Sequence, residues 1–211
     1  MPTSSAGTAT DLRTRRRTAT RIDVQKAALE LFELHGFDDT TVDEIARAAG
    51  ISPRTYFRYF ATKEESILGD THGFDEALQA SLKAACATEE SLAAFSLADI
   101  EEAFRGAIIG FRHDQGEVAA TVLRIRKLVC TNPALSRAAL GRCAENTQRW
   151  LALVDERCSA TTRSRIKMTL EVAQLAIHCA FDEWVNACEP DLPDAELLTI
   201  YDAVCTRVRN L

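Results

Sequence analysis

Cationic and aromatic side chains that could contact a polyanion are concentrated in the segment PRTYFRYFATK, residues 53–63. Arg54 and Arg58 each carry a planar guanidinium, which can donate two hydrogen bonds to one guanine edge or bind a phosphate. Phosphate contacts position a protein on DNA, whereas base-edge contacts read its sequence, and this segment holds residue types suited to both. We therefore expect a nucleic-acid interface here, and the surrounding chain must hold these side chains on one exposed surface.

The flanking residues predict two short helices joined by a tight turn. Thr41 and Glu44 have the T-x-x-E spacing of a capping box, which starts a helix. Gly50 can adopt positive φ and end that helix, and Ser52 followed by Pro53 is an N-cap with a first-turn proline. This arrangement predicts a helix-turn-helix, whose second helix can enter a DNA major groove. An ordinary helical hairpin within a bundle is the alternative.

The charge of the chain is divided unevenly. The net charge is −6, but residues 1–63 hold ten basic and eight acidic side chains, against fifteen and twenty-three in residues 64–211. Phosphate binding depends on the local field rather than on the overall charge. Residues 1–16 lack an apolar period, which predicts a disordered basic arm. Three arginines at the end of this arm are expected to contact DNA, the alternative being a solvated tail: Arg15, Arg16 and Arg17.

The run AALELFELHGFDDTTVDEIARAAGISPRTYFRYFATKEESIL, residues 27–68, resembles the TetR-type transcriptional regulators. The resemblance implies a three-helix DNA-binding domain over residues 17–65. It places five residues toward the groove: Pro53, Arg54, Thr55, Phe57 and Arg58. It places four others at phosphates or helix N-termini: Thr41, Tyr59, Thr62 and Lys63. Phe57 departs from the pattern, which more often has tyrosine, so a hydroxyl is missing there and Tyr59 could take its role.

Residues 66–211 show no alternating strand pattern, so the fold class is all-α. We expect a first helix over about 17–34, and a long fourth helix over 62–85 that Gly69 or Gly73 could loosen. Further helices are expected over about 97–113, 117–130, 133–158, 163–187 and 195–209. The penultimate helix carries a second apolar stripe of Met168, Val172, Leu175 and Cys179, which must be covered on another side. Intrachain packing is one way to cover it. The TetR resemblance implies instead a homodimer formed by the last two helices.

The C-terminal part is also expected to hold a small ligand between its helices, as the TetR resemblance implies. The apolar walls proposed for this pocket are Phe104, Ile108, Phe111, Leu123, Trp150 and Leu175, each of which could equally be core. The run LRIRKLVCTNPALSRAALGRC further resembles the mycofactocin-type regulators, and this implies an acyl-coenzyme A-like effector. An anionic ligand could then meet Arg124, Arg126 or Lys127, although a solvated helix face is the alternative.

Other classes of function have little support in the sequence. No zincin motif, glycine-rich phosphate loop or nucleophile elbow is present, so we expect no catalytic residues, metal or cofactor. No apolar run reaches about 20 residues, and no secretory signal is recognisable, which predicts a cytoplasmic protein. The seven cysteines are expected to be small apolar residues rather than a redox switch. Two alternatives remain: a DNA-binding regulator without a small ligand, and an enzyme or ligand carrier that keeps the helix-turn-helix as structure.

Overall fold

The computed structural model describes residues 6–69, 73–110, 117–154, 158–188 and 196–211, with side chains from residue 15 onward. All regular structure in these ranges is helical, which confirms the all-α prediction. The chain divides into two compact units, Met1–Thr71 and His72–Leu211. The helices are α1 Ala6–His35, α2 Val42–Ala48, α3 Pro53–Phe57, α4 Glu65–Leu68, α5 Phe74–Ala85, α6 Glu89–Ala94, α7 Leu97–Gly110, α8 Glu117–Thr131, α9 Pro133–Leu151, α10 Ala160–Ala187 and α11 Leu197–Arg209.

The predicted helix-turn-helix is present in the first unit, with the predicted caps. The Thr41 backbone N–H donates to the Glu44 carboxylate at 2.8 Å, and the Glu44 N–H donates to Thr41 Oγ1 at 3.3 Å, completing the capping box of α2. Gly50 ends this helix with φ +68°. The Ser52 hydroxyl then accepts a hydrogen bond from the backbone N–H three residues on at 3.1 Å, and Pro53 is the first residue of α3.

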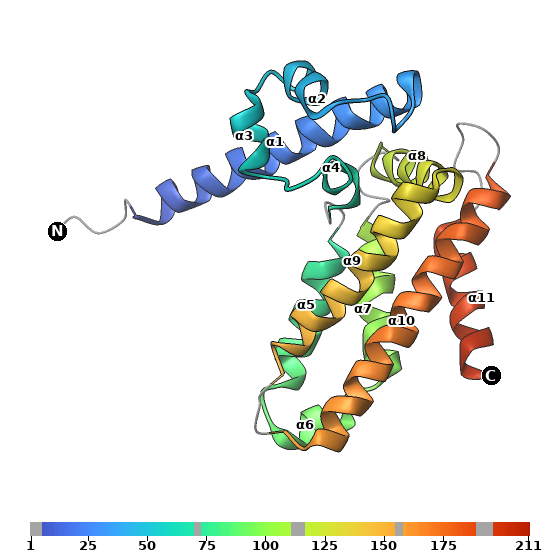
Figure 1. Ribbon diagram of the computed structural model, residues 1–211. Coiled ribbons are helices and arrows are strands. Elements are labelled where there is room, and N and C mark those ends of the chain that lie inside the picture. The colour runs from blue at the N-terminus through green and yellow to red at the C-terminus, as the bar shows by residue number, and fades with distance from the viewer. Residues whose placement is uncertain (1–5, 70–72, 111–116, 155–157, 189–195) are drawn as a thin grey trace. The chain divides into compact units, whose positions relative to one another are not determined.

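The core of the first unit joins α1 to the helix-turn-helix. The C-terminal half of α1 lies beside α2 and α4, whereas its N-terminal half extends beyond them (Figure 1). Tyr56 and Phe60 are buried, with ring centroids 5.3 Å apart. The three-residue spacing of Phe57 and Phe60 predicts that both rings anchor α3, but Phe57 is 57% exposed. The anchor is Tyr56 instead, because Tyr56 and Phe60 are four residues apart and share a buried face. Helix α3 itself ends at Phe57.

Two predicted boundaries differ from the structure. The first helix begins at Ala6 rather than near residue 17, so the described part of the predicted disordered arm is helical. No proline or glycine lies between Thr8 and His35 to interrupt this helix. A helix that is exposed all round can form without a regular spacing of apolar residues. The predicted long fourth helix is two helices, α4 and α5. Gly69 is extended with ψ 143°, and Gly73 adopts φ +84°, so the two glycines separate α4 from α5.

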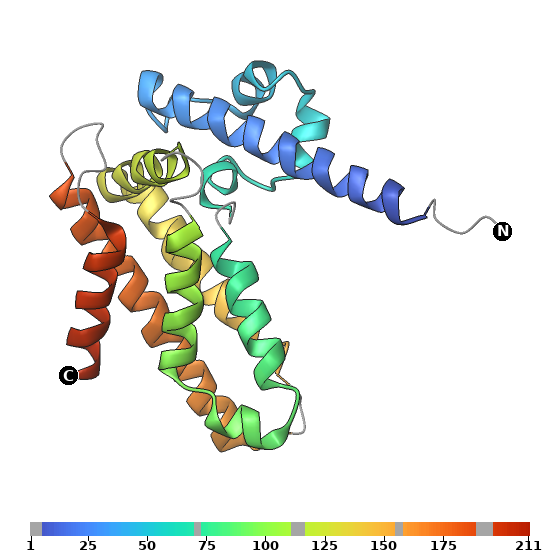
Figure 2. The same cartoon turned by 180° about the vertical axis from the view of Figure 1, so that it is seen from behind.

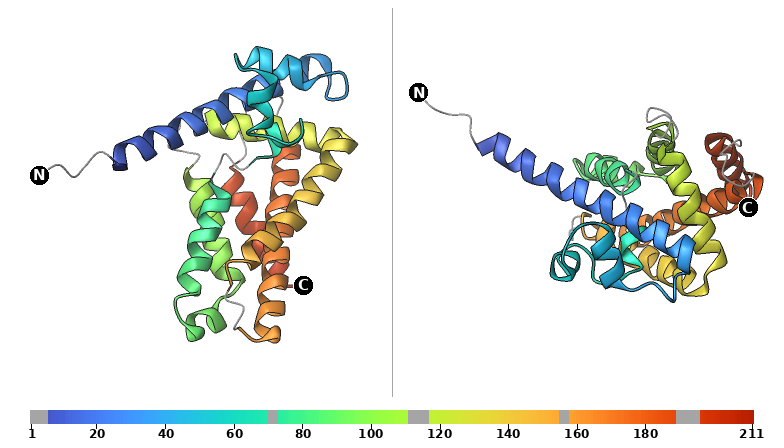
Figure 3. Two further views of the ribbon diagram at one scale, coloured as in Figure 1. Left: turned by 60° about the vertical axis from the view of Figure 1, so that its left-hand side comes forward. Right: turned by 90° about the horizontal axis from the view of Figure 1, so that it is seen from above.

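The second unit is a helical bundle with α10 at its centre. Helix α10 packs against α7, α8, α9 and α11, and α5 packs against α7 (Figures 1 and 2). Helix α8 crosses one end of the bundle, as the view from above also shows (Figure 3). Trp184 and Tyr201, on α10 and α11, are among the largest fully buried side chains. None of the described helices combines the length and the apolar character needed to cross a membrane.

Candidate nucleic-acid interface

Helix α3 presents its polar and cationic side chains on the outside of the first unit. Pro53, Arg54, Phe57 and Arg58 are all exposed, as a groove-facing set must be. Thr55 is half-buried, and its hydroxyl lies 2.9 Å from the Ser52 hydroxyl, so it also supports the cap. The structure therefore brings the five predicted groove residues together on one short helix and the residue that follows it.

Tyr56 holds this exposed surface in place from beneath. Its hydroxyl donates to the Thr62 backbone carbonyl at 3.1 Å, and the residue has no exposed surface. Burial raises the pKa of Tyr56 to about 12, so the phenol stays neutral at physiological pH. This side chain is a structural support and not a DNA contact.

Tyr59 lies between two arginines. The Arg58 guanidinium is 5.2 Å from the centre of the Tyr59 ring, a cation–π arrangement. The Arg21 guanidinium donates to the Tyr59 backbone carbonyl at 3.2 Å and lies 4.7 Å from the centre of the Phe60 ring. Arg21 thus joins α1 to the segment after α3, and Tyr59 is half-buried beside it.

Lys63 has a structural arrangement that the sequence did not indicate. Its ammonium donates to the carbonyls of Phe37 at 2.6 Å, Asp38 at 3.3 Å and Thr40 at 3.1 Å. The same ammonium lies 4.2 Å from the centre of the Phe37 ring. An ammonium group has three donors, and all three have acceptors in this loop. Lys63 therefore fastens the loop before α2, and a phosphate contact would require these bonds to break.

Thr41 is the N-cap of α2, as expected, whereas Thr62 lies three residues before α4, whose N-cap is Glu64. Thr41 is exposed, and its hydroxyl donates to the Glu44 carboxylate at 2.7 Å. Hydrogen bonds from the Thr41 backbone and side chain lower the pKa of Glu44. Thr62 is also exposed, and its hydroxyl accepts from the Glu65 N–H at 3.4 Å. Both hydroxyls are at the surface, but each already serves a helix N-terminus.

The arm arginines lie on α1. Arg15, Arg16 and Arg17 are exposed, and they occupy consecutive helical positions. Successive residues are about 100° apart around a helix, so the three point in different directions. One phosphate row can therefore meet only part of this cluster while the helix persists.

The residues proposed as ligand walls belong largely to one packed core. Phe104, Ile108, Leu123 and Trp150 are buried in the same hydrophobic cluster. Leu175, by contrast, is 57% exposed and does not belong to this cluster. It lies on the outer stripe of α10, where Met168 is 63% exposed and Val172 and Cys179 are half-buried. Phe111 lies outside the described residues.

Arg126, one of the three cationic ligand candidates, contacts the core of the second unit. Its guanidinium lies 4.8 Å from the centre of the Phe181 ring, and its side chain is 14% exposed. It also forms an ion pair with Asp182 at 3.3 Å. Arg124 and Lys127 are half-buried. An anionic ligand would thus compete with Asp182 for Arg126.

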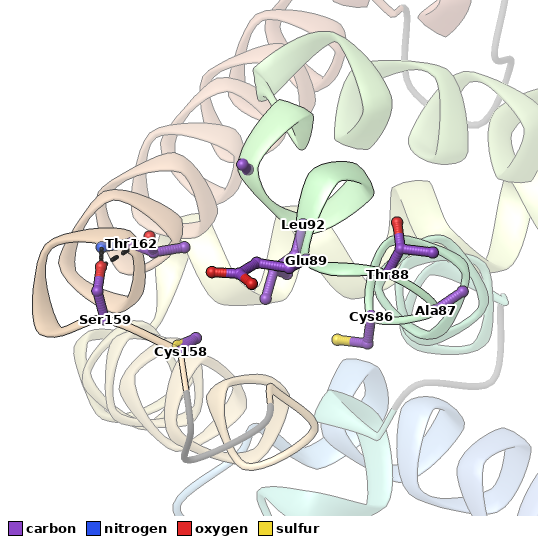
Figure 4. Close-up of a pocket in the computed structure, with 9 residues that line it drawn as sticks. Cys86, Ala87, Thr88, Glu89, Leu92, Cys158, Ser159 and Thr162 are labelled. Atoms are coloured by element: carbon purple, nitrogen blue, oxygen red, sulfur yellow. Dashed lines mark hydrogen bonds between the residues drawn. The ribbon is translucent and has the colours of Figure 1, made fainter.

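The second unit also has a cavity of about 400 Å³ that the sequence did not predict (Figure 4). None of the predicted ligand residues lines it. Thr88 and Ser159 cap the two helices at its edge, α6 and α10. The lining residues are Cys86, Ala87, Thr88, Glu89, Leu92, Ala93, Cys158, Ser159 and Thr162.

Comparison with known proteins agrees with this geometry. Residues 25–65 match the model of the bacterial regulatory proteins of the tetR family. The chain is 37% identical over 149 residues to the HTH-type transcriptional regulator TcmR of Streptomyces glaucescens, covering 69% of this chain and 63% of TcmR. It is 41% identical over 98 residues to a Mycobacterium tuberculosis protein named as a mycofactocin biosynthesis transcriptional regulator, MftR, covering 43% of this chain and 50% of MftR. The chain thus spans less than two thirds of each relative.

Solved structures of regulators also align with most of the chain. One is FadR of Thermus thermophilus, a TetR-family transcriptional repressor solved with lauroyl-CoA, with 18% identity, a TM-score of 0.45, and coverage of 90% of this chain and 93% of FadR. Another is a TetR-family regulator of Streptomyces coelicolor, with 21% identity, a TM-score of 0.43 and the same coverages. Similarity at this level says nothing of this chain's ligand.

The caps, the exposed surface of α3 and the matched residues define a helix-turn-helix protein. Residues 25–65 of this chain form a DNA-binding domain of the tetR family of bacterial regulatory proteins. The curated relatives above are named as transcriptional regulators, which agrees with the expectation that this chain is not an enzyme.

Proposed function

We propose that this chain is a transcriptional regulator that binds a near-palindromic DNA operator as a homodimer and is released by a small effector. The observation that carries the DNA-binding part is the exposed surface of α3. Arg54 and Phe57 are three residues apart and so share a face, and Arg58 follows at the helix end. Arg54 reads a guanine edge with Arg58 beside it in the groove, while the arm arginines meet phosphates.

The dimer is supported by the outer stripe of α10. Met168 and Leu175 together expose two large apolar side chains seven residues apart on one helix. Residues at i, i+4, i+7 and i+11 follow one helical face, so Val172 and Cys179 complete the stripe. A second copy related by a twofold axis can cover it with its own stripe. The α3 helices of the two copies would then enter successive major grooves, about 34–36 Å apart.

The effector is proposed to be small and apolar, or acyl-coenzyme A-like. Support comes from the apolar cluster around Phe104 and from Arg126, which lies within reach of an anionic group at the cost of its bond to Asp182. Because that cluster is closely packed, binding must separate helices of the second unit. Such a ligand releases DNA only to the extent that its affinity for the separated helices differs from its affinity for the packed helices.

The test is fluorescence anisotropy on the DNA upstream of the protein's own gene, at two salt concentrations, with and without a long-chain acyl-coenzyme A. Tight, salt-sensitive binding that the thioester reverses supports both the DNA-binding part and the effector part of the proposal. Tight binding that no acyl-thioester, fatty acid or aromatic compound alters removes the effector and leaves a ligand-independent regulator. Turnover of a candidate substrate without sequence-preferring DNA binding would favour an enzyme or carrier instead.

A further inference from the structure

Phe57 is an exposed aromatic ring at the centre of the proposed reading surface. It is 57% exposed, and it lies one turn beyond Arg54 and next to Arg58. Water contact with so much apolar surface is unfavourable in the free protein. Burial of this ring on binding would therefore be favourable, whatever apolar group covers it.

The ring is fixed from below and cannot turn into the core. Tyr56 packs against it edge to face, with centroids 5.6 Å apart and an interplanar angle of 83°. Tyr56 itself is immobilised by its hydrogen bond to the Thr62 carbonyl and by its contact with Phe60. The space under Phe57 is thus already filled, and its outer face stays available to a partner.

We propose that Phe57 reads the C5-methyl group of a thymine in the operator; this rests on the proposed DNA-binding function. The thymine methyl is the one apolar group that base pairs of unmodified DNA present in the major groove. A phenyl ring has no donor for a phosphate oxygen or a base edge, so its selectivity must come from such an apolar contact. Because Arg54 lies on the same face, the methyl group and a guanine should be close neighbours in each half-site.

Deoxyuridine in place of thymine tests the contact without altering the protein. Deoxyuridine lacks only the methyl group, so base pairing and every hydrogen-bonding edge are kept. The operator is first selected from random duplexes, and each thymine is then replaced in turn. Affinity should fall about fourfold when the contacted thymine is replaced in one half-site, as expected for loss of one methyl contact, and about sixteenfold when it is replaced in both.

Variants assign the effect to Phe57. Phe57→Ala should bind the operator more weakly and should no longer distinguish thymine from deoxyuridine at that position. Phe57→Leu, which keeps an apolar surface, should retain part of the discrimination. Arg54→Ala is the matched control, since it should weaken binding yet keep the full deoxyuridine effect. These side chains are exposed, so the fold of each variant should be unchanged by circular dichroism.

Two results would overturn the inference in different ways. If wild-type protein binds every deoxyuridine-substituted operator as well as the parent, the Phe57 contact is refuted while the regulator function stands. The same holds if Phe57→Ala keeps the deoxyuridine effect, since another residue then reads the methyl. If no sequence is enriched from random duplexes, the proposed DNA-reading function fails, and this inference fails with it.

Discussion

Replacing Lys63 with methionine distinguishes a structural role of this side chain from a role as a DNA contact. Methionine keeps an unbranched apolar stem and removes the ammonium that donates to the carbonyls of Phe37, Asp38 and Thr40. Phe37 and Thr40 are buried residues, at 5% and 1% exposed, so two of these carbonyls sit in a poorly hydrated part of the loop. The Asp38 carbonyl belongs to an exposed residue and can regain water.

The cost follows from these contacts. Each buried carbonyl that loses its donor costs about 1 kcal/mol, and the lost cation–π contact with Phe37 costs about 0.5–1 kcal/mol. The total of about 2–3 kcal/mol should appear as local opening of the helix-turn-helix, since Lys63 joins the end of that motif to the loop that precedes α2. By the relation of 1.4 kcal/mol per factor of ten, hydrogen exchange there should accelerate about 30- to 100-fold.

Hydrogen exchange followed by mass spectrometry measures this directly, with peptides of α7 and α10 as internal references. Lys26→Met is the matched control, because Lys26 is an exposed lysine on α1, and its exchange should equal that of wild type. If Lys63→Met exchanges at the wild-type rate, yet weakens binding to all DNA sequences and lowers the salt dependence by about one phosphate, the reasoning is refuted. Lys63 would then be the phosphate contact that the family resemblance implies.

Three further outcomes follow from the same structure. Arg54→Ala should cost about 1–3 kcal/mol on the operator and relax its specificity, whereas equal losses on operator and random DNA would contradict base reading. Leu175→Glu should convert the proposed dimer to a monomer in light scattering, because it puts a charge on the proposed apolar contact. Lys83→Glu, exposed on α5, should leave the mass unchanged. Burial and the nearby Arg126 lower the pKa of His178 to about 4 from 6.5, so the unfolded chain binds more protons between these values. The free energy of unfolding should therefore fall by roughly 3 kcal/mol from pH 7 to pH 4, and His178→Gln should lose this dependence in urea titrations followed by tryptophan fluorescence.

The parts of the fold that depend on local hydrogen bonds were predictable from the sequence. The capping box of Thr41 and Glu44, the positive φ of Gly50 and the Ser52 cap each involve groups a few residues apart. Their residue types and spacing therefore specify the helix starts and the turn before any tertiary contact is known.

The parts that depend on distant contacts were not predictable in the same way. Lys63 donates to carbonyls 23 to 26 residues away, and no local pattern marks those acceptors. The burial of Tyr56 rather than Phe57 was also not predictable. A helix of five residues is too short for its apolar period to show which ring is buried. Leu175 shared an apolar helix with true core residues, and only the packing of α10 shows that its stripe faces outward.

The central claim, that the exposed surface of α3 reads DNA, is tested most directly by selection from random duplexes with wild-type protein and with an Arg54→Ala, Arg58→Ala double variant. Wild type should enrich one near-palindromic sequence whose half-sites are about one helical turn apart, and the double variant should enrich none. If the double variant enriched the same sequence as wild type, the reading surface would lie elsewhere on the chain. If wild type enriched nothing, the account of this chain as a DNA-reading regulator would be contradicted.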